Sequence, residues 1–345
     1  MRRLRSTLAP TEAVQRCYVM PRFLTPILRR AVLLSLAAAC SHKHAPAPAT
    51  APTLTPPPPR PPPVAVSDLR AMRVNGTVLS YRLAGEQGTP VVFIHGSYGD
   101  LDDWKPQAEA FARTHRVFVY SRRYHPPNPP LDDGRVYSPR LHAEDLAALL
   151  PLLGLSPSYI VGSGYGGYIA LALAQEHPDL VRALVVEEPP ALPFLLRSPA
   201  GDSLRRALIA NSLDPARAAF ARGDSVAGLR LFVDGMADQA GRFDNLAAAG
   251  RARIVAHSFE MRREMLADRQ DYMPPFDCRA LGRLAMPVLL IQGERSPRMY
   301  HVITNELAHC LQSDTVITIP GTGYATNAAS PGIYNRTVLQ YLEMH

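Results

Sequence analysis

The stretch that decides the fold is YIVGSGYGGYIALALAQEHPDLVRALVVEEPP, residues 159–190. It begins with a short β-branched run, passes through a glycine-rich turn, continues as an apolar segment of helical length and returns to a second β-branched run at 183–188. Neither run alternates strictly between apolar and polar residues, which is typical of strands buried on both faces. Strand, helix and strand in this order predict a parallel βαβ unit.

The same pattern extends to both sides of this unit. Further apolar runs lie at residues 90–96, 117–122, 287–293 and 315–321, and helical stretches lie at 104–114, 138–153, 297–311 and 331–344. Near the beginning, two alternating runs flank Asn75-Gly76, a strong hairpin signal. The sequence therefore predicts an α/β fold with a mostly parallel sheet and helices on both faces.

Residues 192–275 interrupt this rhythm, because they are helical in pattern and contain no convincing strand. We expect a helical cap inserted into a sheet domain formed by residues 67–191 and 276–345. Apolar residues in this segment either roof a pocket for a small apolar molecule or pack the cap on the sheet. These residues are Leu195, Leu196, Leu229, Leu231, Phe232 and Met236.

Three stretches resemble the α/β-hydrolase family: the glycine turn VGSGYGG (161–167), FIHGSYGDLDDW (93–104), with its His95-Gly96 pair, and IPGTGYATN (319–327). The resemblance covers residues 72–342 and implies the α/β-hydrolase fold with an esterase-like ancestry. In this family a serine stands at the middle of G-x-S-x-G, on a strained turn between strand and helix. The matching frame here is residues 162–166, so Gly164 occupies the nucleophile position. Ser163 lies one residue early, where the pleat of a strand points its side chain differently.

The catalytic histidine of the family follows the last strand in a pattern like PGxGH, and the matching residues 320–324 place Tyr324 there. A phenol with an ordinary pKa of about 10 is a poor general base near neutral pH, which favours a ring that only fills space. The usual acid position holds Ser296. Some relatives carry the acid one strand earlier, which makes Glu188 the candidate acid here, unless it caps a helix or faces solvent.

The resemblance also implies an oxyanion hole from the backbone N–H of Tyr165 and a second N–H near Ser97, with His95 and Gly96 in the same loop. We expect His95 to brace that loop. Backbone donors survive the replacement of side chains, so this region is expected to remain a site for an anion or a carbonyl group.

Two functions are consistent with these residues. The first is a degenerate hydrolase that lacks the Ser-His pair and uses its pocket to bind a small apolar molecule or a protein partner. The alternative is an active, esterase-like hydrolase acting on an ester or related carbonyl substrate through Glu188, Tyr324, His95 or the cap residue His257. No cysteine stands at the turn, no HExxH or clustered His/Asp/Glu set occurs along the chain, and no GxGxxG opens a βαβ unit, so we expect neither a metal nor a cofactor.

The first forty residues have the layout of a bacterial export signal. Residues 20–40 run from basic residues through a short apolar segment to LAAAC, and this segment is too short to span a membrane. The ending resembles a lipoprotein box, which implies acylation of Cys40 and membrane attachment in the cell envelope. An ordinary cleaved signal or an uncleaved anchor are the alternatives. Residues 41–66 contain ten prolines and are expected to form an extended tether.

The charge of +7 is concentrated in this leader. Residues 1–39 hold seven of the 37 basic residues and one of the 30 acidic ones, so the chain from Cys40 onward is almost neutral. A nucleic-acid partner is therefore not expected. Outside the leader, Cys278 and Cys310 remain, and an oxidising compartment allows a disulfide between them without requiring it.

Overall fold

The computed structural model describes residues 66–312 and 315–345. These residues belong to the second of two compact units, 60–345. The leader with Cys40 and the tether up to residue 65 lie outside the described residues, so acylation and the form of the tether stay predictions. Within the described part of the chain, no helix is both long and apolar enough to cross a membrane.

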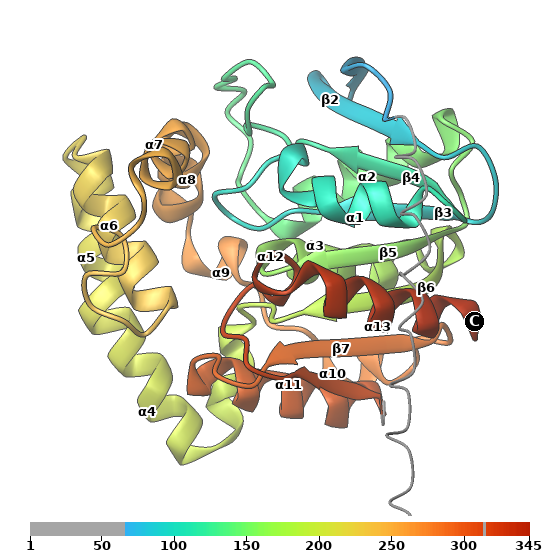
Figure 1. The fold of residues 1–345 in the computed structure, drawn as a ribbon. Helices are drawn as coiled ribbons and strands as arrows, with labels where there is room; N and C mark the ends of the chain where they lie inside the picture. Colours follow the sequence, from blue (N-terminus) through green and yellow to red (C-terminus); the bar gives the residue numbers. More distant parts are fainter. Residues whose placement is uncertain (1–65, 313–314) are drawn as a thin grey trace, which may run out of the picture. The chain divides into compact units, whose positions relative to one another are not determined.

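An eight-stranded sheet forms the centre of the described unit (Figure 1), in the order β1-β2-β4-β3-β5-β6-β7-β8. Strands β3 to β8 are parallel, and β1 and β2 are antiparallel to their neighbours. This confirms the predicted fold class. The bounds are β1 Arg70–Val74, β2 Thr77–Ala84, β3 Pro90–Ile94, β4 Arg116–Tyr120, β5 Ser158–Ser163, β6 Val181–Glu187, β7 Val288–Gly293 and β8 Val316–Ile319.

The predicted hairpin joins β1 to β2. Asn75 and Gly76 both have positive φ, 47° and 77°, as a two-residue hairpin turn requires. The side-chain amide of Asn75 donates to Asp145 Oδ1 at 3.1 Å, and Arg123 binds the same carboxylate through two nitrogens at 2.7 and 2.6 Å. These bonds attach the hairpin to the helix that carries Asp145.

Two hydrophobic clusters cover the two faces of the sheet, because successive residues of each buried strand point to opposite sides. On one face, Val91 and Phe93 pack with Trp104, Phe111 and Val338. The helices on that face are α1 (Lys105–Phe111) and α13 (Pro331–Glu343), which lie side by side in Figure 1. The other face is covered by α2 (Pro139–Leu152), α3 (Tyr165–Glu176) and α11 (Arg298–Leu311).

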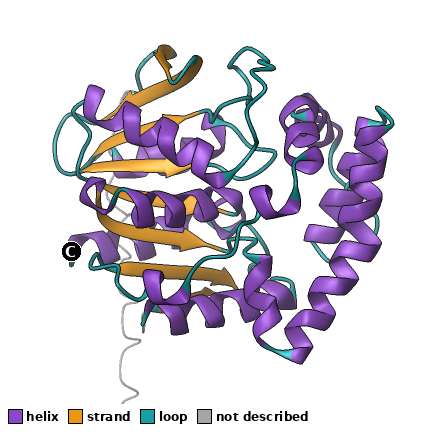
Figure 2. Ribbon diagram, turned by 180° about the vertical axis from the view of Figure 1, so that it is seen from behind, coloured by secondary structure: helices purple, strands orange, loops and turns teal. Residues whose placement is uncertain are grey.

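The segment 192–275 contains helices and turns and no strand, as the sequence pattern indicates. Figure 2 shows these helices as a separate layer at the end toward which the parallel strands point. Leu195, Leu229 and Phe232 are buried in the core, whereas Leu196 is exposed. The cap elements are η3 Leu192–Arg197, α4 Pro199–Leu208, η4 Ile209–Leu213, α5 Asp214–Ala221, α6 Ser225–Met236, α7 Ala248–Ala256, α8 Ser258–Leu266 and α9 Arg269–Tyr272.

A disulfide joins Cys278 to Cys310, with their Cα atoms 4.9 Å apart. Cys278 opens α10 (Cys278–Leu281), where the chain returns from the cap, and Cys310 lies in the last turn of α11. The bond that the sequence allows is therefore present, and it fixes the chain at the return from the cap.

Candidate functional site

The turn between β5 and α3 keeps the conformation of a hydrolase elbow. Gly164 has φ 55° and ψ −125°, a conformation that side-chain-bearing residues adopt only under strain. Its N–H donates to Glu187 O at 2.9 Å. The chain approaches β3 so closely here that a Cβ on Gly166 would overlap the carbonyl groups of Ile94 and His95. Strand–helix packing thus sets the turn, without any side chain at its apex.

Tyr324, in the loop after β8, fills the space above this turn. An ideal Cβ placed on Gly164 would overlap Tyr324 Oη, and the next residue it meets, Gly96, is 3.9 Å away at Cα. The Tyr324 ring stacks on Tyr300 of α11, with 4.8 Å between ring centroids. Burial raises the pKa of Tyr324 well above its ordinary value, so the phenol stays protonated near neutral pH. The positions of nucleophile and base therefore adjoin, and one hydroxyl occupies the room between them.

Glu188 and Ser296, the two acid positions named from the sequence, are hydrogen-bonded to each other. Its Oε1 accepts hydrogen bonds from Gly293 N at 2.8 Å and from the Ser296 hydroxyl, and its Oε2 accepts from Ala325 N at 3.0 Å. Burial, together with the neighbouring charge of Glu187, raises the pKa of Glu188 to about 8. Glu188 thus neither caps a helix nor faces solvent, and it holds the backbone next to Tyr324.

The adjacent Glu187 is engaged with a different set of groups. Its Oε1 accepts from the Thr326 hydroxyl at 2.5 Å and from Asn327 N at 3.0 Å, both in α12 (Thr326–Ala329). The hydroxyl of Ser163 is also among the donors that favour the charged form of Glu187. Ser163 is the last residue of β5 and therefore does not stand at the apex of the elbow, which is Gly164.

The loop after β3 lies beside the elbow and is held by Arg122. His95 Nε2 accepts from Arg122 N at 2.9 Å, which leaves His95 Nδ1–H to donate to Gly96 O at 3.0 Å. The Arg122 guanidinium donates to His95 O at 3.1 Å and to Gly96 O at 2.8 Å. The N–H of Tyr165 is the first of α3, and such first-turn donors have no partner inside their own helix. This loop and the first turn of α3 adjoin at the elbow, since Gly96 Cα lies 3.9 Å from an ideal Cβ on Gly164, and an oxyanion hole between them stays a prediction.

A cap carboxylate joins this loop to α8. Glu264 Oε1 accepts from the hydroxyls of Ser97 at 2.8 Å and Tyr272 at 2.7 Å, and Oε2 accepts from Tyr137 at 3.1 Å. Glu264 is only 1% exposed, and burial raises its pKa. The sequence analysis missed Arg122 and Glu264. The available signal was the spacing of His257, Glu260 and Glu264, which places three polar side chains on one helix face.

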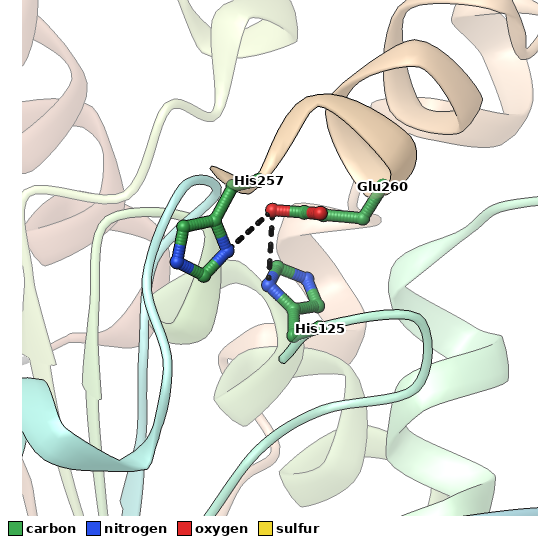
Figure 3. Close-up of side chains that lie close together, drawn as sticks. All are labelled: His125, His257 and Glu260. Carbon is green, nitrogen blue, oxygen red and sulfur yellow. Dashed lines mark ion pairs between the residues drawn. The ribbon is translucent and has the colours of Figure 1, made fainter. Parts of the chain in front are cut away.

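His125, His257 and Glu260 meet at the same junction of cap and sheet domain (Figure 3). One nitrogen or oxygen donor from each residue lies within 4.8 Å of the others. The sequence has no His/Asp/Glu set clustered along the chain, and for that reason no metal site was expected. The folded chain nevertheless brings these three residues together, because segments far apart in the sequence converge here. His257, named as an alternative acid–base residue, lies with Asp100 and Glu260.

Three surface hollows among the described residues lie away from Gly164 and Tyr324. One of these, of about 150 Å³, lies among apolar cap residues that include Leu192, Leu196 and Met273. Directly above Gly164, the Tyr324 hydroxyl occupies the space that a side chain on residue 164 would enter.

Comparisons with known proteins agree with this geometry. The sequence model of the family described as "alpha/beta hydrolase fold" matches residues 89–323. The chain is 29% identical over 136 residues to "Uncharacterized hydrolase YraK" of Bacillus subtilis, covering 39% of this chain and 48% of that protein. It is 37% identical over 112 residues to "sn-1-specific diacylglycerol lipase ABHD11" of Mus musculus, covering 31% of this chain and 36% of that protein. The aligned region thus spans less than half of either curated relative.

Solved structures share the fold at low sequence identity. The structure of Est816, titled an N-acyl homoserine lactone degrading enzyme, has a TM-score of 0.63 at 21% identity, covering 79% of this chain and all of that one. A thermophilic esterase from Thermogutta terrifontis has a TM-score of 0.63 at 20% identity, covering 81% and 99%. At this identity the likeness concerns the fold alone.

Proposed function

Because this chain belongs to the alpha/beta hydrolase fold family, we propose that it is a degenerate hydrolase, a member that keeps the elbow and the oxyanion loop and uses them for binding. One observation carries the proposal: Tyr324 Oη stands where the side chain of a nucleophile on residue 164 would begin. A phenol with a raised pKa neither attacks a carbonyl carbon nor takes a proton at neutral pH.

The proposed ligand is a small acyl compound whose carbonyl or anionic oxygen accepts from the backbone N–H groups of Tyr165 and of the loop near Ser97. Tyr98 and Tyr324 supply hydroxyls, and Tyr98 packs edge-on against Phe232 of the cap at 6.3 Å, which gives an aromatic wall. The similar proteins named above act, by their titles, on diacylglycerol and on N-acyl homoserine lactones. Acyl compounds of these two kinds are therefore the ligands to test first.

The test of lost nucleophilic catalysis is labelling with a fluorophosphonate, which reacts with activated serines. The purified wild type should form no covalent adduct, because Gly164 has no hydroxyl and Ser163 lies at the end of β5, one residue before the apex of the elbow. Acyl ligands should nevertheless raise the thermal midpoint, by an amount that grows with the logarithm of their concentration once it exceeds Kd. Stoichiometric labelling at Ser163 contradicts the proposal and identifies a displaced nucleophile.

An active hydrolase with non-standard residues is the second candidate, and one observation favours it. Glu188, with a pKa of about 8, can exchange a proton in the physiological range beside the Tyr324 loop. In that case the wild type hydrolyses short p-nitrophenyl esters, and Glu188→Gln abolishes turnover without unfolding the protein. Turnover that survives Glu188→Gln excludes Glu188 as the acid or base.

We also propose that the protein is exported and attached to the membrane through an acylated Cys40. The support is the order of basic residues, short apolar run, cysteine and proline-rich tether in residues 20–66. Mass spectrometry of the membrane fraction should find a lipid-modified N-terminus at Cys40. A mature protein that retains residues before Cys40 contradicts this proposal.

A further inference from the structure

We propose that His125, His257 and Glu260 bind a divalent transition metal of the zinc type at the junction of the cap and the sheet domain. His125 lies in the loop after β4, His257 immediately precedes α8 and Glu260 lies in its first turn. Figure 3 shows the two imidazole rings facing the Glu260 carboxylate from two different segments. None of the three residues belongs to the elbow, so the inference is independent of the proposed function.

The distances fit ligands that share a metal ion. Glu260 Oε1 is 2.7 Å from His257 Nδ1 and 3.5 Å from His125 Nδ1. The 2.7 Å contact is an ion pair when His257 is protonated, and a bound cation would take the place of that proton. Zinc bonds of about 2.0–2.2 Å at tetrahedral angles put neighbouring ligand atoms roughly 3.3 Å apart. The observed donors therefore need only small side-chain adjustments to surround one ion.

Burial makes these donors costly without a partner. His125 and Glu260 are fully buried and His257 is 1% exposed. Both carboxylate oxygens of Glu260 and His257 Nδ1 lack a hydrogen-bond partner among the described residues. Buried polar atoms in native proteins almost always have partners, because leaving one unpaired costs about 1–3 kcal/mol. A cation bound between them would satisfy all three.

The surrounding residues supply the supports that metal sites commonly show. His257 Nε2 faces Asp100 Oδ2 at 3.4 Å, as in sites where a carboxylate orients a metal-bound imidazole. His125 Nδ1 donates a hydrogen bond to Gly99 O at 2.9 Å, and the buried Nε2 of the same ring has no partner among the described residues. Metal binding through Nδ1 requires the other tautomer, with the proton on Nε2, and the fourth position would be left to water. Two imidazoles with one carboxylate suit zinc or cobalt better than magnesium or calcium, which prefer oxygen ligands.

Nearby cations are already paired, so they do not exclude the ion. Arg253 contacts Asp100 at 3.0 Å and Asp103 at 2.5 Å. The Arg122 guanidinium is bound to two carbonyl groups and to the Tyr137 hydroxyl. A metal here would cross-link α8 of the cap to the loops after β3 and β4, which assigns it a structural role.

The test uses the purified mature chain, stripped with a chelator and titrated with zinc chloride and, separately, with cobalt chloride. We expect one equivalent of zinc by elemental analysis, and a cobalt complex with the strong visible absorption of a tetrahedral site. The thermal midpoint should rise with zinc concentration, because the ion binds the folded state. Less than one equivalent of bound zinc, or a cobalt spectrum identical to that of the hydrated ion, overturns the proposal.

Variants separate this site from adventitious binding. Glu260→Gln keeps the side-chain shape and removes the charged donor, and His257→Gln removes an imidazole; each should weaken zinc affinity by about 100-fold or more. The matched control is His177→Gln, in the partly exposed group Glu144, Glu176 and His177, which should leave affinity for the His125, His257 and Glu260 site unchanged. Equal affinity in wild type and Glu260→Gln overturns the assignment. If His257→Gln does not fold, the cobalt spectrum of the wild type and the zinc affinity of Glu260→Gln still test the proposed site.

Discussion

Two buried polar regions at the carboxyl ends of the strands contrast in chemistry. We call the first, formed by Gly164 and Tyr324, the elbow region, and the second, formed by Arg122, His125, His257, Glu260 and Glu264, the cap junction. The elbow region has the backbone of a reaction centre, with glycine and tyrosine at the nucleophile and base positions. The cap junction has ionisable groups in abundance, but they bind one another and the backbone. The difference is between a turn whose apex carries no side chain and a junction whose ionisable side chains contact one another and the backbone.

The largest effect is expected when a nucleophile and a base are placed in the elbow region, because this removes its chemical contrast with the cap junction. Gly164→Ser combined with Tyr324→His should create esterase activity toward p-nitrophenyl esters, about 10²–10⁴-fold above the wild type, which is the usual contribution of a positioned base. The serine needs the room that Tyr324 Oη now occupies, and imidazole is smaller than phenol. Initial rates with the folded double variant measure the gain.

The single variants and the acid are the controls for this gain. Gly164→Ser alone should stay inactive and lose stability, because its Cβ meets the Tyr324 hydroxyl. Tyr324→His alone has no nucleophile. Adding Glu188→Gln to the double variant should lower the new activity, by up to about 10⁴-fold if Glu188 orients the histidine. A folded double variant without activity would mean that the elbow backbone no longer supports acyl transfer.

An effect of intermediate size compares how much the two regions contribute to the free energy of unfolding. Glu264→Ala should lower the free energy of unfolding by about 3–5 kcal/mol, because it leaves three hydroxyls and the buried Arg122 charge without their carboxylate. Tyr324→Phe removes one neutral hydroxyl from the elbow region and should change stability by about 1 kcal/mol or less. Urea unfolding of both variants measures the difference. Equal losses would show that the cap junction is not held by its charges.

The last expected effect concerns pH and is spread over several pH units. Burial raises the pKa of Glu188 from 4.5 to about 8, so the folded protein keeps a proton that the unfolded chain releases. The stability contributed by this group is fully present below pH 4.5 and is lost as pH rises through 8, with a slope of at most about 1.4 kcal/mol per pH unit. Unfolding curves of wild type and Glu188→Gln from pH 5 to 9 should converge at low pH and separate at high pH. Parallel curves would show that Glu188 is ionised throughout.

Local patterns in the sequence were sufficient to predict the sheet and the elbow. The runs around Gly164 and the Asn75-Gly76 turn encode their own geometry, because buried strands, helices and hairpin turns depend on neighbouring residues. The strand expected at 117–122 is an informative exception, since β4 ends at Tyr120. Arg122 and Arg123 leave the ladder there, and their guanidinium groups bind the loop after β3 and the Asp145 carboxylate.

The contents of the two regions depend on tertiary contacts that no local pattern encodes. The overlap of Tyr324 Oη with the nucleophile space requires the packing of the β8 loop over the elbow. Likewise, the cap junction forms only when α8 lies against the loops after β3 and β4. Glu188 combines a predictable and an unpredictable property. Its position after β6 follows from the sequence, whereas its raised pKa results from burial beside Glu187 in the folded chain.

The chain passes between the sheet domain and the cap twice, and the Cys278–Cys310 disulfide restrains only one of these two crossings. The outgoing crossing passes through Pro189 and Pro190 into η3, whereas the return crossing ends at a cysteine bonded covalently to α11. Reduction of this disulfide to two thiols would remove the covalent link between the return crossing and α11, and the cap would then be attached to the sheet domain through two crossings of the same kind.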